Sequence, residues 1–418
     1  MPAVEPPLPA TPDQADARRR FAILVASHLN VDLYPIFIVA LAVSLQENLA
    51  LTNKQRAMVI AIGPIVSGVC QPLFAWIGDK LNTRLFGPLG LALGALCISS
   101  IGFAQNLTQL LILQIVGLIG VGIYHPISSA VAGKLGRQAL TGARYARSPR
   151  TTALSIFFLA GMLGGTFGPI IASRLNNATG DMRWLSVMIV PGLVMAWILW
   201  RATRRVEHKT AIAHHTESDE PIDHAPRQRA VALLFASNSL RFIANVGCYY
   251  LFTAWARQSF DDADIASNKA STLVAATTLG MAVATIIAGL QHAGGERKLL
   301  ALTGFLSAPF VLAIPFLPMP GMMLAAFVAA SLYFTAIPAG ISLSHRLLPH
   351  ATGMTGSLLM GAGWVLSSLG PLVGEQIVGT SADNGLRLAF AFMAIMLVLS
   401  GVAGLLLNPA LIHETLDD

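Results

Sequence analysis

The stretch RRVEHKTAIAHHTESDEPIDHAPRQR, residues 204–229, is a long polar interruption in an otherwise apolar chain. On both sides of it the sequence consists mainly of apolar segments long enough to cross a bilayer, which takes about 20 residues. Six of these segments precede the stretch and six follow it. We therefore expect residues 204–228 to be a linker between two halves that each contain six transmembrane helices.

The composition supports a membrane protein. Of the 418 residues, 54% are hydrophobic and 11% are charged, whereas soluble proteins carry about 25% charged residues. The sequence thus predicts an all-α membrane protein with twelve transmembrane helices. The predicted spans are 21–46, 56–78, 84–104, 107–133, 150–174, 184–202, 229–256, 268–291, 297–317, 320–344, 350–379 and 385–408.

The two halves carry related sequence patterns. GGTFGPIIASRL in the fifth span and WVLSSLGPLVGEQI in the eleventh are each built around a Gly-Pro pair. This similarity predicts two pseudo-symmetric six-helix halves, residues 21–203 and 229–408. The polar, proline-rich residues 1–20 and the short segment 409–418 are expected to be tails outside the membrane, the first of them disordered.

The basic residues indicate the orientation, because loops on the cytoplasmic side carry an excess of lysine and arginine. With both termini in the cytoplasm, 19 of the 27 lysines and arginines fall on the inside. This topology also explains the net charge of +6 without a nucleic-acid partner. We expect a multi-pass protein with both termini cytoplasmic.

The loop after the second span has the sequence AWIGDKLNTR, residues 75–84. With Asp79, Lys80 and Arg84 it resembles the cytoplasmic loop motif of the major facilitator superfamily, whose members have twelve spans in two halves. The resemblance implies a substrate site near the bilayer midplane between the halves, and alternating access. It assigns Asp79 to the cytoplasmic gate, the alternative being a solvated loop charge. GLQHAGGERK in the second half lacks this acid, so we expect the gate to depend mainly on the first half.

The fifth span resembles the Gly-x-x-x-Gly-Pro motif of antiporters in the same superfamily at Gly164, Gly168 and Pro169. Glycines four residues apart let helix backbones approach closely, and proline bends a helix. The resemblance assigns these residues to gating and favours export. The alternative is the packing of small residues between helices.

Four segments taken together resemble a narrower group. They are ASHLNVDLYP in the first span, YHPISSAVA in the fourth, ALSIFFLAGMLGGTFGPIIA in the fifth and HRLLPHATGMTGSLLMGAG between the tenth and eleventh. In this order and spacing they resemble the fosmidomycin resistance proteins, a bacterial drug-efflux branch of the superfamily. This resemblance implies a location in the bacterial cytoplasmic (inner) membrane. The branch tends to carry an acid before Leu-Leu-Pro, where this chain has His345 and Arg346, so the substrate does not follow from the resemblance.

Few ionisable residues lie deep within the predicted spans. Such a group costs about 2.5–3.5 kcal/mol on insertion and usually faces a cavity or an ion pathway. His28 and Asp32 are four residues apart and therefore share one face of the first span, and His125 precedes Pro126 in the fourth. The resemblance places these three groups and Arg241 of the seventh span around one cavity.

Asp32 is the first candidate for proton coupling. We expect it to be protonated in one conformation and paired with His125 or Arg241 in the other, because a nearby cation favours the ionised form. The alternative is a fixed structural ion pair. His125 and His28 are further candidates, since the unperturbed pKa of histidine is about 6.5. For both rings the alternative is a neutral side chain that hydrogen-bonds a neighbouring helix.

Arg241 is the first candidate for substrate binding, because its planar guanidinium suits a phosphonate or a carboxylate. It could equally be the standing partner of Asp32 or extend to the cytoplasmic edge of the membrane. Glu47 and Glu375 are predicted near the outer interface, with an outer gate or proton entry as the alternative. The neutral substrate-binding candidates, for which packing is the alternative, are Asn30, Tyr34, Tyr124, Asn245 and Tyr249.

Motifs of other function classes are not found. The sequence has no Walker loop, no Gly-x-Ser-x-Gly elbow, no His-Glu-x-x-His and no cysteine pair, and the linker histidines His208, His214 and His215 fit no defined metal site. We therefore expect no enzyme activity, catalytic residue, cofactor or metal.

The function that these observations favour is proton-coupled secondary transport by a monomer. The expected partners are protons, the lipid bilayer and a small polar or anionic compound, such as a fosmidomycin-like drug or a metabolite, that the protein exports by alternating access. The alternative is a proton-coupled importer or facilitator of a small organic anion.

Overall fold

The computed structural model describes residues 12–80, 84–141, 149–206, 224–289 and 294–417. This part of the chain is helical without strands, and twelve of its helices are long and apolar enough to cross a membrane. The predicted fold class and the predicted twelve spans are therefore confirmed.

Each half contributes six of these spans. The N-terminal half consists of α1 (Pro12–Leu33) continued by α2 (Pro35–Ala40) and α3 (Ala42–Asn48), then α4 (Asn53–Lys80), α5 (Phe86–Ser99), α6 (Leu107–Leu140), α7 (Pro149–Thr179), η2 (Met182–Met188) and α8 (Ile189–Thr203). The C-terminal half consists of α9 (His224–Ser259), α10 (Ala263–Gly289), α11 (Glu296–Ala313), α12 (Met319–Leu347), then α13 (Thr352–Ser357), η5 (Leu358–Ala362), α14 (Gly363–Ser367) and α15 (Leu369–Val378) as one interrupted span, α16 (Gly385–Leu405) and α17 (Pro409–Asp417).

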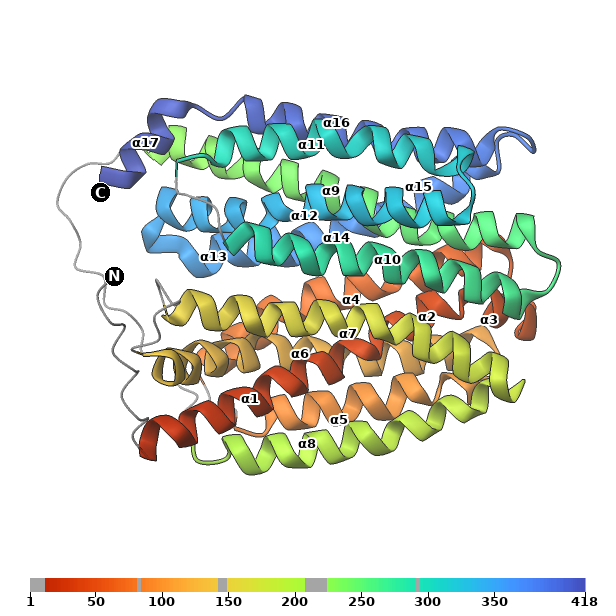
Figure 1. Ribbon diagram of the computed structural model, residues 1–418, viewed down its shortest axis with the longest axis horizontal. Helices are drawn as coiled ribbons and strands as arrows, with labels where there is room; N and C mark the ends of the chain where they lie inside the picture. Colours follow the sequence, from red (N-terminus) through yellow and green to blue (C-terminus); the bar gives the residue numbers. More distant parts are fainter. Residues whose placement is uncertain (1–11, 81–83, 142–148, 207–223, 290–293, 418) are drawn as a thin grey trace, which may run out of the picture.

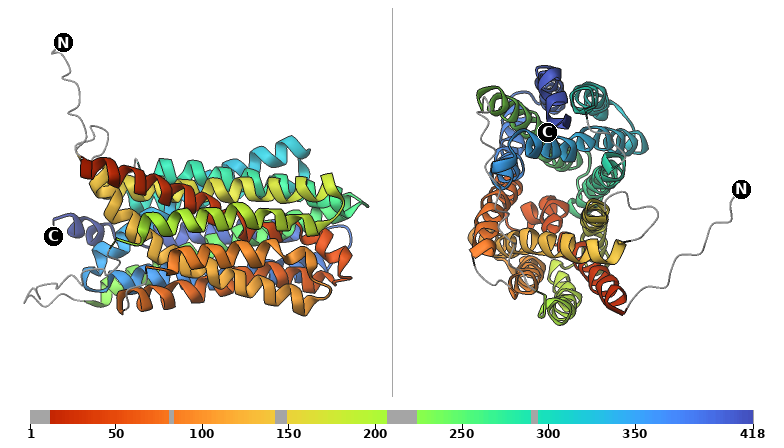
Figure 2. Two further views of the ribbon diagram at one scale, coloured as in Figure 1. Left: turned by 90° about the horizontal axis from the view of Figure 1, so that it is seen from below. Right: turned by 90° about the vertical axis from the view of Figure 1, so that its left-hand side faces the viewer.

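The helices of the two halves form two groups that lie side by side (Figures 1 and 2). α17 and the beginning of α1 lie at one end of the bundle, which we call the α17 end, and α3 lies at the other, the α3 end (Figure 1). The halves meet where α7 packs against α10 and where α4 packs against α14 and α15.

The first helix begins earlier than predicted. Pro12 and the acidic Asp13 form its first turn, a sequence favourable for a helix N-terminus. Arg20 and Asp16 form an ion pair one turn apart, with an N–O distance of 2.7 Å, and Phe21 is buried. The expectation of a disordered segment up to residue 20 is therefore wrong for residues 12–20.

The predicted C-terminal tail also contains a helix, α17. Leu411 and Ile412 are buried against the C-terminal half, and Glu414 forms an ion pair of 2.7 Å with Arg227 at the start of α9. α17 is thus part of the packed structure at its end of the bundle.

Glycines on α7 allow a close approach between α7 and α1. A Cβ atom on Gly164 would overlap the carbonyl oxygen of Leu29, and one on Gly168 would overlap that of Leu33. The motif at these positions therefore packs α7 directly onto the backbone of α1, as expected for glycines four residues apart. This finding bears out the packing role. α7 continues through Pro169 without a break.

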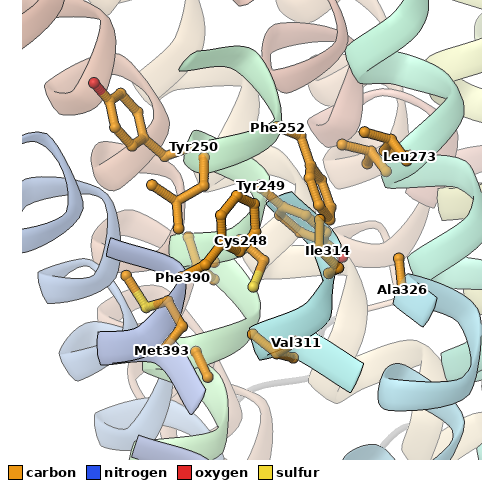
Figure 3. Close-up of a cluster of buried hydrophobic side chains, with 14 of the residues drawn as sticks. Cys248, Tyr249, Tyr250, Phe252, Leu273, Val311, Ile314, Ala326, Phe390 and Met393 are labelled. Atoms are coloured by element: carbon orange, nitrogen blue, oxygen red, sulfur yellow. The ribbon is translucent and has the colours of Figure 1, made fainter. Parts of the chain in front are cut away.

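The core of the C-terminal half gathers around α9 near the α3 end. Tyr249, Phe252, Leu273 and Phe390 are buried together there (Figure 3). Tyr250, the next residue on α9, turns its hydroxyl away from this cluster (Figure 3). That hydroxyl is therefore available for contacts outside the core.

We predict that Gly164→Ala lowers the free energy of unfolding by about 1–3 kcal/mol, because an added methyl group in a tight interface forces the helices apart. The measurement is the midpoint of thermal unfolding of the purified protein in detergent. Gly165→Ala is the matched control, since its Cβ would lie 3.7 Å from the nearest atom of Thr278, an ordinary contact. Equal destabilisation by the two variants would contradict the packing role of Gly164.

Candidate functional site

A carboxylate lies between two imidazole rings in the N-terminal half. Asp32 Oδ1 is 3.1 Å from His125 Nε2, and Asp32 Oδ2 is 3.3 Å from His28 Nε2. His28 and Asp32 are one turn apart on α1, and His125 is brought to them by the middle of α6. Asp32 thus lies against His125, as expected for one conformation, and His28 belongs to the same cluster.

The other nitrogen of each ring is held by the backbone. His28 Nδ1 is 2.6 Å from the carbonyl oxygen of Phe157, and His125 Nδ1 is 2.8 Å from that of Val121. A carbonyl oxygen only accepts hydrogen bonds, so each Nδ1 carries the hydrogen. In a neutral imidazole the remaining nitrogen, here Nε2, then presents a lone pair.

These tautomers create an electrostatic conflict at the centre of the cluster. An ionised carboxylate is also an acceptor, so neutral rings would direct two lone pairs at the oxygens of Asp32. A proton on one ring or on the carboxyl group turns one of these two contacts into a hydrogen bond, and a metal ion between the three groups relieves both. The arrangement therefore has the chemistry to hold a cation.

The surrounding residues fix the cluster in place and expose it on one side. The His28 ring is stacked on Phe157 with a centroid distance of 3.9 Å and is fully buried. A Cβ atom on Gly161 of α7 would overlap both Asp32 Oδ2 and the His28 ring. The side chains of Asp32 and His125 remain 14% and 23% exposed. Within the described part of the chain no lysine or arginine forms an ion pair with Asp32.

The two halves are bonded to one another at the α3 end. Asp264, at the start of α10, accepts hydrogen bonds from Ser44 of α3 and Asn176 of α7, with distances of 2.7 and 2.8 Å. Ser44 also lies 2.8 Å from the hydroxyl of Ser267. This network joins α3 and α7 of one half to α10 of the other.

A second group of contacts joins the halves on the other side of α9. The Tyr250 hydroxyl donates to Glu375 of α15, and Arg56 of α4 approaches the same hydroxyl at 3.5 Å. Arg257 and Glu47 form an exposed ion pair of 3.6 Å. Both glutamates that were predicted near the outer interface therefore take part in contacts at the α3 end, and Glu47 makes its contact across the halves.

Comparison with known proteins identifies the family. Residues 23–261 match the model of the Major Facilitator Superfamily, which is more than half of the chain. The chain belongs to this superfamily. Since the family and the fold are those of transporters, the prediction that the protein is not an enzyme is confirmed.

Relatives within the superfamily cover nearly the whole chain. The fosmidomycin resistance protein of Escherichia coli (strain K12) is 23% identical over 395 residues, which is 91% of each protein. A crystal structure of a POT family transporter in complex with 5-aminolevulinic acid superposes with a TM-score of 0.72 at 13% identity, covering 94% of this chain and 97% of that one. An inward-facing, unoccupied bacterial homolog of the human lysosomal transporter Spinster gives a TM-score of 0.64 at 14% identity, covering 97% and 98%.

Arg241 lies apart from the Asp32 cluster of this superfamily member. Its guanidinium is fully buried and donates to Thr303 Oγ1 at 3.1 Å and to the carbonyl oxygens of Tyr333 at 3.0 Å and Leu300 at 2.5 Å. These acceptors belong to α11 and α12 of the C-terminal half. The predicted pairing with Asp32 and the predicted extension to the membrane edge are therefore wrong, and the donors proposed for an anion are used by the protein.

The neutral candidates of the N-terminal half are also held by neighbouring helices. The Tyr34 hydroxyl donates to the carbonyl oxygen of Met188 at 3.0 Å and approaches Asn30 at 3.5 Å. Tyr124 is fully buried, and its hydroxyl lies 2.7 Å from that of Ser27. Of the three, only Tyr124 lies beside the cluster, with its ring centroid 5.7 Å from that of His125.

The neutral candidates of the C-terminal half lie within its own core. Tyr333 donates to Asn245 Oδ1 at 2.6 Å, and the Tyr249 hydroxyl lies 3.6 Å from the sulfur of Met281. Both predicted residues are buried. The structure therefore gives them packing contacts and does not bring them together with Asp32.

The predicted cytoplasmic gate is described in part. α4 ends at Lys80, and the side chains of Asp79 and Lys80 lie outside the described residues, as do the linker histidines. Arg84 Nη1 lies 3.4 Å from the carbonyl oxygen of Arg204 and thus joins the ends of two spans.

The structure shows a charged pair in the second half that the sequence did not indicate. Arg346 forms an ion pair of 2.5 Å with Glu296, which also accepts from the Gly294 amide at 2.8 Å. Glu296 lies three residues after Ala293, the sequence position that corresponds to Asp79 in the first half. The second half thus has an acid, Glu296, near the corresponding loop. Its partner is Arg346, the arginine of the sequence HRLLP.

We predict that Arg241→Gln lowers the free energy of unfolding by at least about 2 kcal/mol, because buried carbonyl groups lose their donors. Arg257→Gln is the control, since an exposed ion pair contributes about 0–1 kcal/mol. The measurement is thermal unfolding in detergent. If the two variants unfolded at the same temperature, Arg241 would not be the brace of α9, α11 and α12 that its contacts imply.

Proposed function

We propose that this protein is a proton-coupled secondary transporter of the bacterial inner membrane, with both termini in the cytoplasm, that exports a small polar or anionic compound as a monomer. The observation that carries the proposal is the Asp32 carboxylate between the bare Nε2 atoms of His28 and His125. Such a carboxylate in the membrane interior holds a cation in order to be stable.

The proton is the coupling ion that fits this arrangement. A proton on His125 or on Asp32 converts one pair of opposed acceptors into a hydrogen bond. His125 and Asp32 are the exposed members, whereas His28 is buried. We infer that protons enter and leave through His125 and Asp32 and that His28 positions the carboxylate.

The contacts at the α3 end support one conformation within the proposed transport cycle. With the termini in the cytoplasm, the α3 end faces the outside, where Asp264, Tyr250 and Glu375 hold neighbouring helices together. We infer that the structure is a state closed to the outside. Opening to the outside then requires that these hydrogen bonds break. During this gating motion, Gly164, Gly168 and Pro169 of α7 keep the N-terminal half rigid.

The gating role of Asp79, Lys80 and Arg84 is part of the same proposal. These residues belong to the α17 end, which this topology places in the cytoplasm. Contacts there would form as those at the α3 end break, so that one side of the membrane is closed at a time.

Export is favoured by the similarity to a protein named for fosmidomycin resistance. The substrate site is proposed next to the exposed faces of Asp32 and His125, with Tyr124 beside them, and does not include Arg241. The alternative function is proton-coupled import of a small organic anion, and the direction of the driving gradient separates the two.

The test is accumulation in proteoliposomes with an imposed pH gradient, using fosmidomycin and a set of small organic acids as probes. An exporter that exchanges substrate for protons accumulates the probe when the lumen is acidic, because protons leave as the probe enters. An importer that carries both together accumulates it when the lumen is alkaline. Equal accumulation of the probe with an acidic lumen, with an alkaline lumen and without a pH gradient would contradict proton coupling.

We predict that Asp32→Asn reduces gradient-driven accumulation to the level of empty liposomes, because the amide cannot be ionised. Exchange of labelled for unlabelled probe at equal pH should persist and shows that the variant is folded. Asp262→Asn is the control, since this exposed carboxylate caps α10 and asparagine keeps the accepting oxygen. Unchanged accumulation in Asp32→Asn would remove Asp32 from the coupling mechanism.

A further inference from the structure

We propose that His28, Asp32 and His125 form a binding site for a divalent transition-metal cation such as Zn²⁺ or Co²⁺. The site uses the side chains of the proposed proton site, but metal binding to them does not require transport. We did not expect this site from the sequence, because the three ligands come from two helices that are distant in the chain.

The donor atoms have the right identity and spacing. Two imidazole nitrogens and a carboxylate are a ligand set of zinc and related metals, and the three donor atoms lie within 4.8 Å of one another. Two ligands at about 2.1 Å from one tetrahedral ion are separated by about 3.4 Å. His125 Nε2 lies 3.1 Å from Oδ1 of Asp32 and His28 Nε2 lies 3.3 Å from Oδ2, so each carboxylate oxygen is near this distance from one of the two rings.

The second shell is that of a metal site. Histidines that bind metals donate their other ring N–H to a carbonyl or carboxylate, which fixes the tautomer and the direction of the ring. Here the Nδ1 atoms of His28 and His125 both donate to backbone carbonyl oxygens, at 2.6 and 2.8 Å. Both rings therefore direct Nε2, the nitrogen that would bind a metal, toward Asp32.

The position of the site leaves part of the coordination sphere open. Phe157 and Gly161 close it on the side of His28, whereas Asp32 and His125 are accessible. The open side can take water or an oxygen donor of a bound substrate. Two nitrogen ligands favour zinc, cobalt or nickel over calcium and magnesium, which prefer oxygen.

A bound metal would exclude the coupling proton, because both use the Nε2 lone pairs and the carboxylate oxygens. Zn²⁺ should therefore stop gradient-driven transport when it occupies this site.

The experiment titrates Co²⁺ into the full-length protein, purified without a polyhistidine tag in detergent, and records the visible d–d absorption. We expect a single saturable site that Zn²⁺ displaces, and an affinity at least tenfold lower in His28→Ala and in His125→Ala, since even second-shell changes cost 10–100-fold. The double variant His214→Ala/His215→Ala in the linker is the control and should bind as the unmodified protein does.

X-ray absorption of the Zn²⁺-loaded, unmodified protein identifies the ligands without relying on a variant. Scattering from two imidazole rings supports the proposal, and a spectrum with oxygen ligands only overturns it. The proposal is also overturned if Co²⁺ does not bind or if it binds equally to the two histidine variants. Because these measurements involve no gradient, a protein that binds Co²⁺ but fails to transport protons contradicts the proposed function and leaves this inference intact.

Discussion

Three hydrogen-bond acceptors are forced to face one another inside the N-terminal half, and this constraint organises the rest of the site. The backbone carbonyls of Phe157 and Val121 occupy the Nδ1 hydrogens of two histidines, which leaves two lone pairs aimed at Asp32. The close packing of α7 on α1, made possible by Gly161 and Gly164, keeps these groups from moving apart. An ionised Asp32 in this arrangement needs a cation nearby, and exchange of that cation is the basis of the proposed coupling.

The two halves have related folds, but their buried ionisable groups make different contacts. The N-terminal half carries the proposed cation site. In the C-terminal half, the buried guanidinium of Arg241 donates its hydrogen bonds to α11 and α12. These hydrogen bonds join α9 to α11 and α12. Since the halves are bonded to one another at the α3 end, a rocking motion that breaks Asp264 and Tyr250 from their partners would change access to Asp32.

The features that could be predicted from the sequence are those that depend on composition and on short-range spacing. Twelve apolar segments gave the spans, and the rarity of ionisable residues at depth singled out His28, Asp32 and His125. The direction of Arg241 was not predictable, because α9 carries polar residues such as Ser237, Asn238 and Asn245 on several faces, and its pattern does not show which neighbour each face meets. The Glu296–Arg346 pair was missed because its members are 50 residues apart. The helical residues 12–20 were predicted to be disordered because the segment is rich in proline, although Pro12 and Asp13 form a favourable helix start.

The protonation of the two imidazole rings tests the central claim most directly. The measurement is ¹⁵N NMR of the protein labelled at histidine, with the resonances assigned by His28→Gln and His125→Gln. The account predicts that Nδ1 of both rings is protonated throughout and that only the Nε2 signals change when the site gains or loses its cation. A neutral His28 or His125 with its hydrogen on Nε2 and a bare Nδ1 would contradict it, because Asp32 would then have a hydrogen-bond donor and need no cation.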